Sequence, residues 1–284
     1  MAIDWLDLPA PPALPGLFAR AALRRSVSGR SLPNLGLRCQ VTVDPAHLAR
    51  YRQICGFSDN GLLPATYPHI LAFALQMQLL TDKRFPFPLL GLVHLENRIR
   101  VLRPLGGLGP FSVSVQVQGL RPHDKGVSFS LITQLHDQLG LLWEGDSRIL
   151  CRALRLDGKP AEQAAEAPRP QTTLAHWQAP ADIGRRYARI AGDYNPIHLF
   201  AASAKLFGFP RAIAHGLWNK GRALAELGSR LPSAGYQVAV RFHKPVLLPS
   251  DVHLQASEAT PHGQFSLLGK DELMHMSGSW SPLD

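Results

Sequence analysis

The stretch Tyr187-Ala-Arg-Ile-Ala-Gly-Asp-Tyr-Asn-Pro-Ile-His198 decides how the whole chain is interpreted. Its first six residues have a weak counterpart in Tyr51-Arg-Gln-Ile-Cys-Gly56, with Tyr, Ile and Gly in common. Two further echoes follow in the same order: Tyr67–Leu75 with Phe209–Leu217, and Val101–Pro104 with Val246–Pro249. Three matches in one order indicate that the chain is a duplicated unit.

The composition between the two copies suggests where they separate. Residues 159–170 are rich in Pro, Ala and Glu, which is typical of a linker. A length of 284 residues also suits two units. The predicted organisation is an N-terminal extension, a first unit, a linker and a second unit, with bounds 1–35, 36–155, 156–175 and 176–284.

Each half has the pattern of one buried helix followed by strands. The segment 67–82 is apolar on nearly all sides, which is typical of a buried helix, and 212–228 is its expected partner. Alternating apolar residues and turn signals predict strands in both halves. These strands are 111–118, 127–137, 141–154, 235–247, 251–259, 263–269 and 272–280. The expected fold class is α+β, with a central helix wrapped by a curved antiparallel β-sheet in each half.

Composition excludes several classes of protein. The chain has 3 Cys, an odd and widely spaced set that argues against a disulfide framework or a zinc knuckle. No apolar stretch reaches the roughly 18 residues of a membrane span. The net charge is +9, but the basic residues are scattered and not clustered as nucleic-acid binding requires. We therefore expect a cytoplasmic protein without a membrane span or nucleic-acid partner.

The N-terminal extension leaves a targeting role open. Residues 1–35 carry several Arg and few acids, as transit peptides do. Asp4, Asp7 and the prolines before residue 34 disfavour an amphipathic presequence helix. A targeting role is therefore the less favoured interpretation.

The loop after Tyr187 carries the groups for acid–base chemistry. Gly192-Asp193 and Asn195-Pro196 are turn formers, so Asp193 and His198 can converge across an irregular loop. A carboxylate beside an imidazole can move protons at neutral pH, and Asn195 can orient a water. Gly216 lies near the start of the second helix, where free N–H groups can stabilise an oxyanion. Each piece could instead be structural, with His215 serving only in packing; the combination is much more restrictive.

This combination resembles a known family. Gly192-Asp-Tyr-Asn-Pro-Ile-His198 and Ile213-Ala-His-Gly216 are similar to the hydratase-2 signature of the MaoC-like dehydratases, the (R)-specific enoyl-CoA hydratases. The resemblance implies a double hot-dog fold over residues 36 to 284. It also implies that Asp193 and His198 activate water and deliver a proton, that Asn195 helps hold them, and that the Gly216 N–H stabilises the thioester oxygen. Ala191 and Leu199-Phe200 depart from the family pattern and leave substrate preference open.

The first half lacks these groups. In the alignment of the echoes, Phe57 and Leu62 stand where Asp193 and His198 do, and Phe73-Ala74 replaces His215-Gly216. We therefore expect one active site per chain. We also expect the first half to supply an apolar tunnel for a longer acyl chain.

The implied reaction is hydration of a trans-2-enoyl-CoA to the (R)-3-hydroxyacyl-CoA, or the reverse dehydration. No metal or separate cofactor is expected, because coenzyme A is part of the substrate. Candidate contacts for its phosphates are Arg211, Lys220, Arg241 and Lys244, although surface solvation explains each as well. Three alternatives stay open: an acyl-carrier-protein substrate, a hot-dog thioesterase, and a non-catalytic acyl-binding protein. The chain could be a monomer or a homodimer.

Overall fold

The computed structural model describes residues 3–160, 167 and 169–283. The chain forms two compact units. The first comprises Met1–Val43, Pro68–Asn97 and Leu108–Glu166, and the second comprises Asp44–Tyr67, Arg98–Gly107 and Ala167–Asp284. Two segments of the first half of the sequence thus belong to the second unit, whereas the repeat predicted contiguous units. The centre of the predicted linker, 161–166 and 168, lies outside the described residues.

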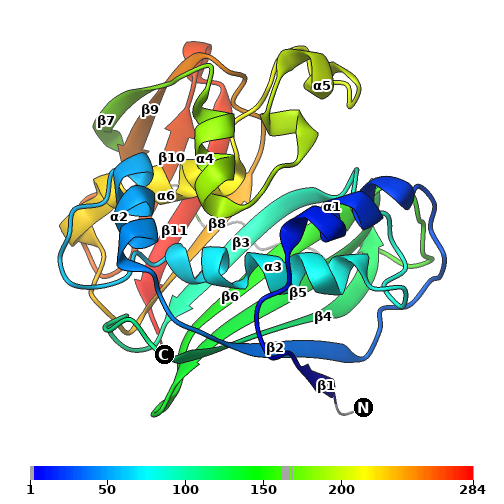
Figure 1. Cartoon of the computed structure of the whole chain (residues 1–284). Coiled ribbons are helices and arrows are strands. Elements are labelled where there is room, and N and C mark those ends of the chain that lie inside the picture. The colour runs from blue at the N-terminus through cyan, green and yellow to red at the C-terminus, as the bar shows by residue number, and fades with distance from the viewer. Residues whose placement is uncertain (1–2, 161–166, 168, 284) are drawn as a thin grey trace. The chain divides into compact units, whose positions relative to one another are not determined.

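The first unit is built on an antiparallel sheet with one parallel strand at its edge. Its strand order is β1-β2-β4-β5-β6-β3, and β1 pairs with β2 in parallel (Figure 1). The strands are β1 (Asp4–Asp7), β2 (Leu35–Val41), β4 (Phe111–His123), β5 (Gly126–Asp137) and β6 (Gly140–Cys151), together with the part of β3 (Val93–Val101) up to Asn97. The strands predicted at 111–118, 127–137 and 141–154 are therefore confirmed as β4, β5 and β6.

A buried helix packs on this sheet. Helix α3 (Tyr67–Thr81) matches the predicted helix 67–82, and its Ala72, Leu75 and Leu79 are fully buried. The side chain of Gln76 in α3 donates a hydrogen bond to Thr133 of β5 at 2.9 Å, which fixes the helix against the sheet. Helix α1 (Leu14–Leu23) belongs to the same unit and buries Leu17. The N-terminal extension is therefore partly structured.

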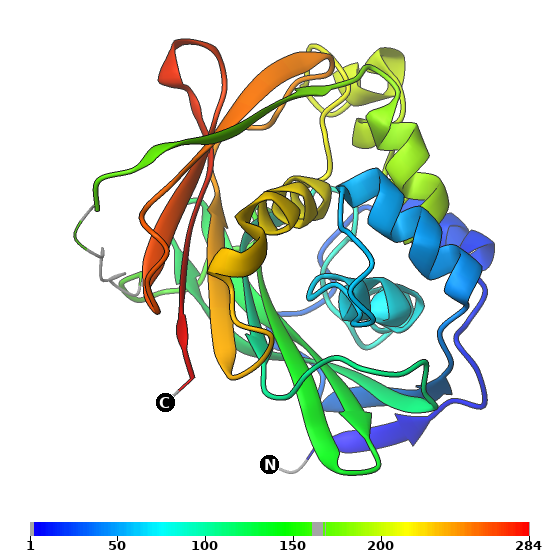
Figure 2. The same ribbon diagram turned by 90° about the vertical axis from the view of Figure 1, so that its left-hand side faces the viewer.

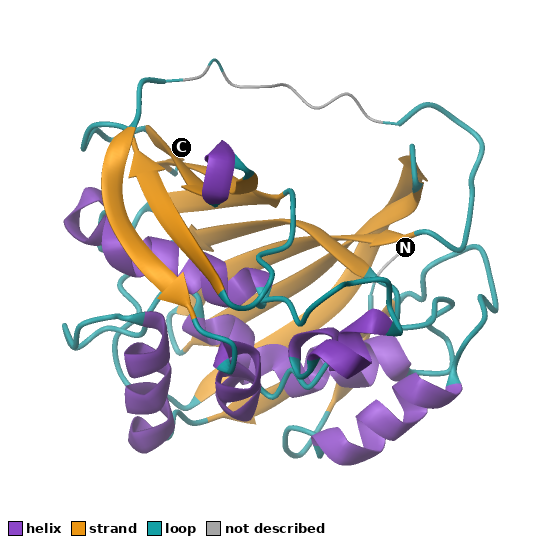
Figure 3. Cartoon of the chain, turned by 90° about the horizontal axis from the view of Figure 1, so that it is seen from above, coloured by secondary structure: helices purple, strands orange, loops and turns teal. Residues whose placement is uncertain are grey.

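The strands of the second unit pair antiparallel in the order β8-β11-β10-β9-β7. The strands are β7 (Thr172–Ala179), β8 (Tyr236–Phe242), β9 (Ser250–Ala256), β10 (Gly263–Leu268) and β11 (Met274–Pro282). Helix α6 (Gly216–Leu227), the dark yellow helix in Figure 2, belongs to this unit. Its Ala223, Leu224 and Leu227 are buried. Figure 3 distinguishes the helices (purple) from the strands (orange). Helix α5 (Ala201–Lys205) and short 3₁₀ turns at Pro196–His198, Gly228–Arg230 and Lys270–Glu272 also belong to this unit.

The helix predicted at 212–228 begins later than expected. Residues 212–214 are extended, because Ala214 N–H donates to Val246 O at 2.9 Å and Leu248 N–H donates to Ala212 O at 2.8 Å. Residues 246–248 thus pair with 212–214 and are not part of β8. The strand predicted at 235–247 therefore ends at Phe242. The second echo is therefore not structurally equivalent, since Phe73-Ala74 lies inside α3 and His215-Gly216 lies at the start of α6.

The first echo is a genuine structural repeat. Helices α2 (Pro45–Cys55) and α4 (Ile183–Ala191) each end on a glycine in the left-handed region, Gly56 with φ 77° and Gly192 with φ 75°. Glycine adopts that conformation without steric cost, which explains why it ends both copies. Both helices belong to the second unit, where they pack against each other.

The described residues contain no helix with both the length and the apolar character needed to cross a bilayer. Cys39, Cys55 and Cys151 are free and buried, in agreement with the expectation of no disulfide framework.

Candidate active site

The loop that carries Asp193 starts where α4 ends. After Gly192, the Asn195 N–H donates to Asp193 Oδ1 at 3.2 Å, and Asn195 Oδ1 accepts from Ile197 N–H at 3.4 Å. The second contact caps the 3₁₀ turn Pro196–His198. Asn195 therefore shapes the loop between the two predicted catalytic residues. Its expected part in holding them stays a prediction.

His198 has one ring nitrogen bound and the other available. Its Nδ1 lies 2.8 Å from the backbone oxygen of Ile213. Because a carbonyl can only accept, Nδ1 carries the proton and Nε2 of the neutral ring has a free lone pair. The side chain is buried, and this burial lowers the pKa of His198, while Asp193 and the Ile213 carbonyl act in the opposite direction. His198 is thus equipped to accept a proton at neutral pH.

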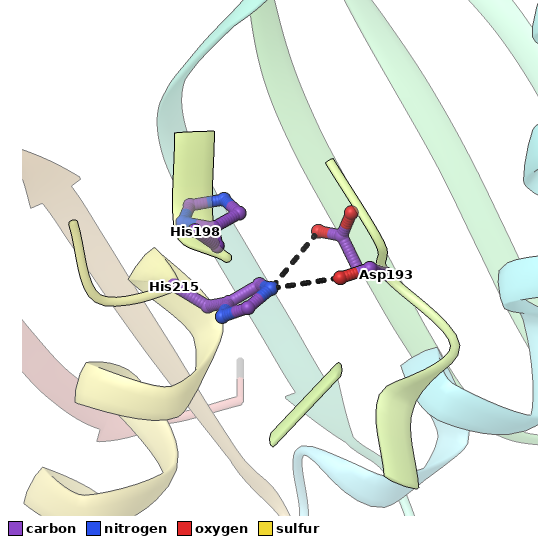
Figure 4. A group of neighbouring side chains, drawn as sticks. All are labelled: Asp193, His198 and His215. Carbon is purple, nitrogen blue, oxygen red and sulfur yellow. Dashed lines mark hydrogen bonds and ion pairs between the residues drawn. The ribbon is translucent and has the colours of Figure 1, made fainter. Parts of the chain in front are cut away.

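A second histidine joins the loop residues. His215 Nε2 lies 3.0 Å from the backbone oxygen of Asp193 and 3.8 Å from its Oδ2 (Figure 4). The His215 ring stacks on His198 with centroids 3.7 Å apart. One ligand-type atom from each of Asp193, His198 and His215 lies within 4.8 Å of the others. The sequence therefore correctly predicted that Asp193 and His198 converge. It placed His215 in the family signature, with packing as the alternative, but gave it no role of its own in the site.

The cluster could in principle hold a metal ion, but its hydrogen bonds favour proton chemistry. His215 Nε2 faces a backbone carbonyl and donates to it, and His198 Nδ1 does the same toward Ile213, so one nitrogen of each ring already carries a proton. Asp193 is about a third exposed, so solvent can reach its carboxylate. An exposed carboxylate next to a buried neutral imidazole can exchange protons with a bound molecule.

Gly216 is the first residue of α6, directly after His215. The N-terminal end of a helix presents free N–H groups and the positive end of its dipole. A Cβ at Gly216 would lie 3.0 Å from the ring of Phe242, so the glycine allows this ring to pack closely. The expected oxyanion role of the Gly216 N–H stays a prediction.

The four basic candidates for coenzyme A differ in exposure. Arg211, Arg241 and Lys244 are exposed, and Arg211 also donates to Pro249 O at 3.1 Å. Lys220 is fully buried, and its Nζ lies 3.4 Å from Val238 O. Burial also holds the pKa of Lys220 well below its ordinary value. Lys220 is therefore not placed to meet a phosphate from solvent, and this expectation needs correction.

A cavity of about 370 Å³ lies at the other end of α6. Its wall includes Leu63, Leu105, Leu224 and Tyr236, all within the second unit. Segments 57–65 and 101–105 of the first half thus contribute to it. A second cavity of about 520 Å³ lies in the first unit, beside α1 and the end of α3.

These features define the class: an α+β protein with a cluster of one carboxylate and two histidines next to the start of a helix that packs on an antiparallel sheet. A family model described as the MaoC like domain matches residues 158–264. The 3-hydroxyacyl-thioester dehydratase X of Mycobacterium tuberculosis is 36% identical over 253 residues, which cover 87% of this chain and 90% of that protein. The chain belongs to the MaoC-like dehydratase family.

Solved structures agree on the fold. The crystal structure of HtdX from Mycobacterium tuberculosis has a TM-score of 0.75 at 31% identity, covering 87% of this chain and all (100%) of that one. A conserved hypothetical protein from the same species, described as a double hot-dog fold, has a TM-score of 0.55 at 13% identity, covering 93% and 97%. The double hot-dog fold predicted from the sequence is thereby confirmed.

Proposed function

We propose that this protein adds water to a trans-2-enoyl thioester to give the (R)-3-hydroxyacyl thioester, and catalyses the reverse dehydration. The coarser activity, hydration or dehydration of acyl thioesters, follows from the family and from relatives named as 3-hydroxyacyl-thioester dehydratases and as an enoyl-CoA hydratase. The carrying observation is that His198, whose Nε2 keeps its lone pair because Nδ1 donates to Ile213 O, lies in one cluster with the partly exposed carboxylate of Asp193. The (R) configuration rests on the resemblance to hydratase 2.

In the hydration direction, the site removes one proton from water and delivers one proton to C2 of the double bond. His198 and Asp193 together take a proton from water, and the water oxygen bonds to C3 of the acyl chain. The C2–C3 π electrons shift toward C2, and the thioester oxygen gains negative charge. The Gly216 N–H at the start of α6 stabilises this charge. The Asp193–His198 pair then delivers a proton to C2, so the atoms of one water are added and no group is oxidised or reduced.

The group that carries the acyl chain as a thioester, coenzyme A or an acyl carrier protein, is less well determined than the reaction. We propose coenzyme A, with the exposed Arg211, Arg241 and Lys244 as candidates for its phosphates. The net charge of +9 suits such an anion, but it also suits an acidic acyl carrier protein. Direct binding of an enoyl-coenzyme A and of the matching carrier-protein thioester distinguishes the two. Proposed with this activity are a cytoplasmic location, a monomeric or homodimeric state, and no separate metal or cofactor.

The decisive experiment follows the loss of enoyl-thioester absorbance with wild type, Asp193→Asn and His198→Ala. General acid–base groups contribute on the order of 10²–10⁴-fold each, so both variants are expected to lose at least about 100-fold in rate. Equal rates in all three proteins would rule out the mechanism. Release of free thiol without loss of the double bond would instead support the thioesterase alternative. Binding without turnover by wild type would support a non-catalytic acyl-binding protein.

A further inference from the structure

His215 has a fixed proton position that the catalytic loop depends on. Its Nε2 lies 3.0 Å from the backbone oxygen of Asp193, which can only accept a hydrogen bond. Nε2 therefore carries the proton of the neutral ring. Its Nδ1 is buried and has no hydrogen-bond partner within the part of the chain that the structure describes. His215 thus has a single N–H, and Asp193 receives it.

The surroundings of His215 keep this ring neutral. Only 3% of the residue is exposed. The His198 ring stacks on it at 3.7 Å between centroids, and the tilted Tyr187 ring lies 4.9 Å away. Burial and the neighbouring His198 hold the pKa of His215 well below its ordinary value, although the Asp193 carbonyl acts in the opposite direction. The carboxylate of Asp193 at 3.8 Å is the nearest charged group in these contacts.

We propose that His215 is a positioning residue for the reaction. Its Nε2–H holds the Asp193 peptide in place, and its neutral ring stacks against the His198 ring and fixes its orientation. The inference rests on the proposed hydratase activity. His215 does not exchange protons with substrate, because Nε2–H is bound to a carbonyl and Nδ1 is enclosed by protein.

The neutral state of His215 allows its ring to stack on His198 without opposing proton transfer to His198. When His198 accepts a proton, an imidazolium forms 3.7 Å above the His215 ring. A second positive charge at that distance would oppose proton transfer, whereas the face of a neutral ring tolerates it. The hydrogen bond to Asp193 O holds the backbone that carries the carboxylate, within the same cluster as His198. Displacement of a catalytic group by about 1 Å can cost on the order of 100-fold in rate.

The kinetic test compares His215→Leu, which keeps apolar volume but has no donor, with His215→Gln, whose amide can again donate to Asp193 O. Histidine His253 in β9, which contacts Glu272 at 3.2 Å, gives the matched control His253→Gln. We expect kcat of the Leu variant to fall about 100-fold with KM nearly unchanged. We expect the Gln variant to recover on the order of tenfold of that loss, and the control to resemble wild type.

Three kinetic results would overturn the proposal: an unchanged kcat in the Leu variant, equal losses in the Leu and Gln variants, or loss of the acidic limb of the pH–rate profile in the Gln variant. The last would make His215 itself the titrating group. Thermal unfolding of each variant shows whether it is folded.

A measurement on the wild-type protein needs neither activity nor a variant. Nuclear magnetic resonance of ¹⁵N-histidine-labelled protein is expected to show His215 as the Nε2–H form from pH 5 to 8, through the pH range in which free histidine titrates near pH 6.5. Protonation of His215 in that range, or the Nδ1–H form, would contradict the inference. If wild type has no hydratase activity but shows this form, the proposed function fails and the positioning geometry does not.

Discussion

At the scale of single residues, the location of one proton on His198 determines what the site can do. The Ile213 carbonyl fixes that proton on Nδ1 and leaves the lone pair of Nε2 for a water molecule. Burial lowers the pKa of His198, and the carboxylate of Asp193 partly reverses this effect. The basic form therefore predominates above the ordinary histidine pKa of about 6.5.

The protonation state of His198 predicts how kcat depends on pH. In the proposed mechanism the neutral form of His198 is the base, so kcat for hydration should be level above about pH 6.5 and should fall only at lower pH. Asp193→Asn removes the charge that raises the pKa of His198, so the residual activity should have its acidic limb at still lower pH. A pH–rate series from about 4.5 to 8 tests this expectation. A limb that moves to higher pH in the variant would contradict it.

The sequence predicted these two residues because their geometry is local. Turn-forming residues bend the chain between Asp193 and His198, so their convergence can be inferred from spacing alone. His215 reaches Asp193 by a different route. Its position depends on the extended segment 212–214 pairing with residues 246–248, a contact that spacing does not reveal. The adjacent His-Gly pair was visible in the sequence, but its contact with Asp193 was not.

At the scale of elements, helix α4 supports the loop through a glycine. A Cβ on Gly184 would overlap the carbonyl oxygen of His198, so the helix backbone lies directly against the turn Pro196–His198. Gly184→Ala should therefore displace the Pro196–His198 turn and lower both the unfolding temperature and kcat. Gly16→Ala in α1 is the control, because a Cβ added there would have no atom within 4 Å. Alanine is also more favourable than glycine in a helix, by up to about 1 kcal/mol. Equal behaviour of the two variants in thermal unfolding and turnover would contradict this account.

Periodicity identified the elements whose burial is regular. The all-apolar segment of α3 and the alternating strand β4 appear as predicted. Helix α2 was not predicted, although its Tyr51–Gly56 end had been matched to that of α4. Its role comes from tertiary contacts: His47 Nε2 donates to Ile190 O at 2.8 Å, and Trp218 Nε1 donates to Ile54 O at 2.9 Å. A sequence of ordinary hydrophobicity does not show which unit such a helix will join.

At the scale of the whole molecule, the duplication has given the two halves of the sequence different tasks. The second half carries Asp193 and His198. The first half contributes Asp44–Tyr67 and Arg98–Gly107 to the same compact unit. Those segments line the 370 Å³ cavity together with the end of α6. Leu62 and Phe57, which align with the catalytic positions, are among the lining residues, so apolar replacement there is consistent with a site for hydrocarbon.

The length of the acyl chain tests this division of tasks. Helix α6 rises about 1.5 Å per residue, so Gly216 at the active-site end and Leu224 at the cavity are about 12 Å apart along its axis. If the cavity receives the end of a longer acyl chain, Ala225→Leu, which adds volume to its wall, should reduce kcat/KM for long-chain enoyl thioesters about tenfold. The four-carbon substrate should be unaffected, as should the control Ala19→Leu on the exposed side of α1. A wild-type preference for four carbons that declines steadily with chain length would remove the basis for an acyl site in this cavity.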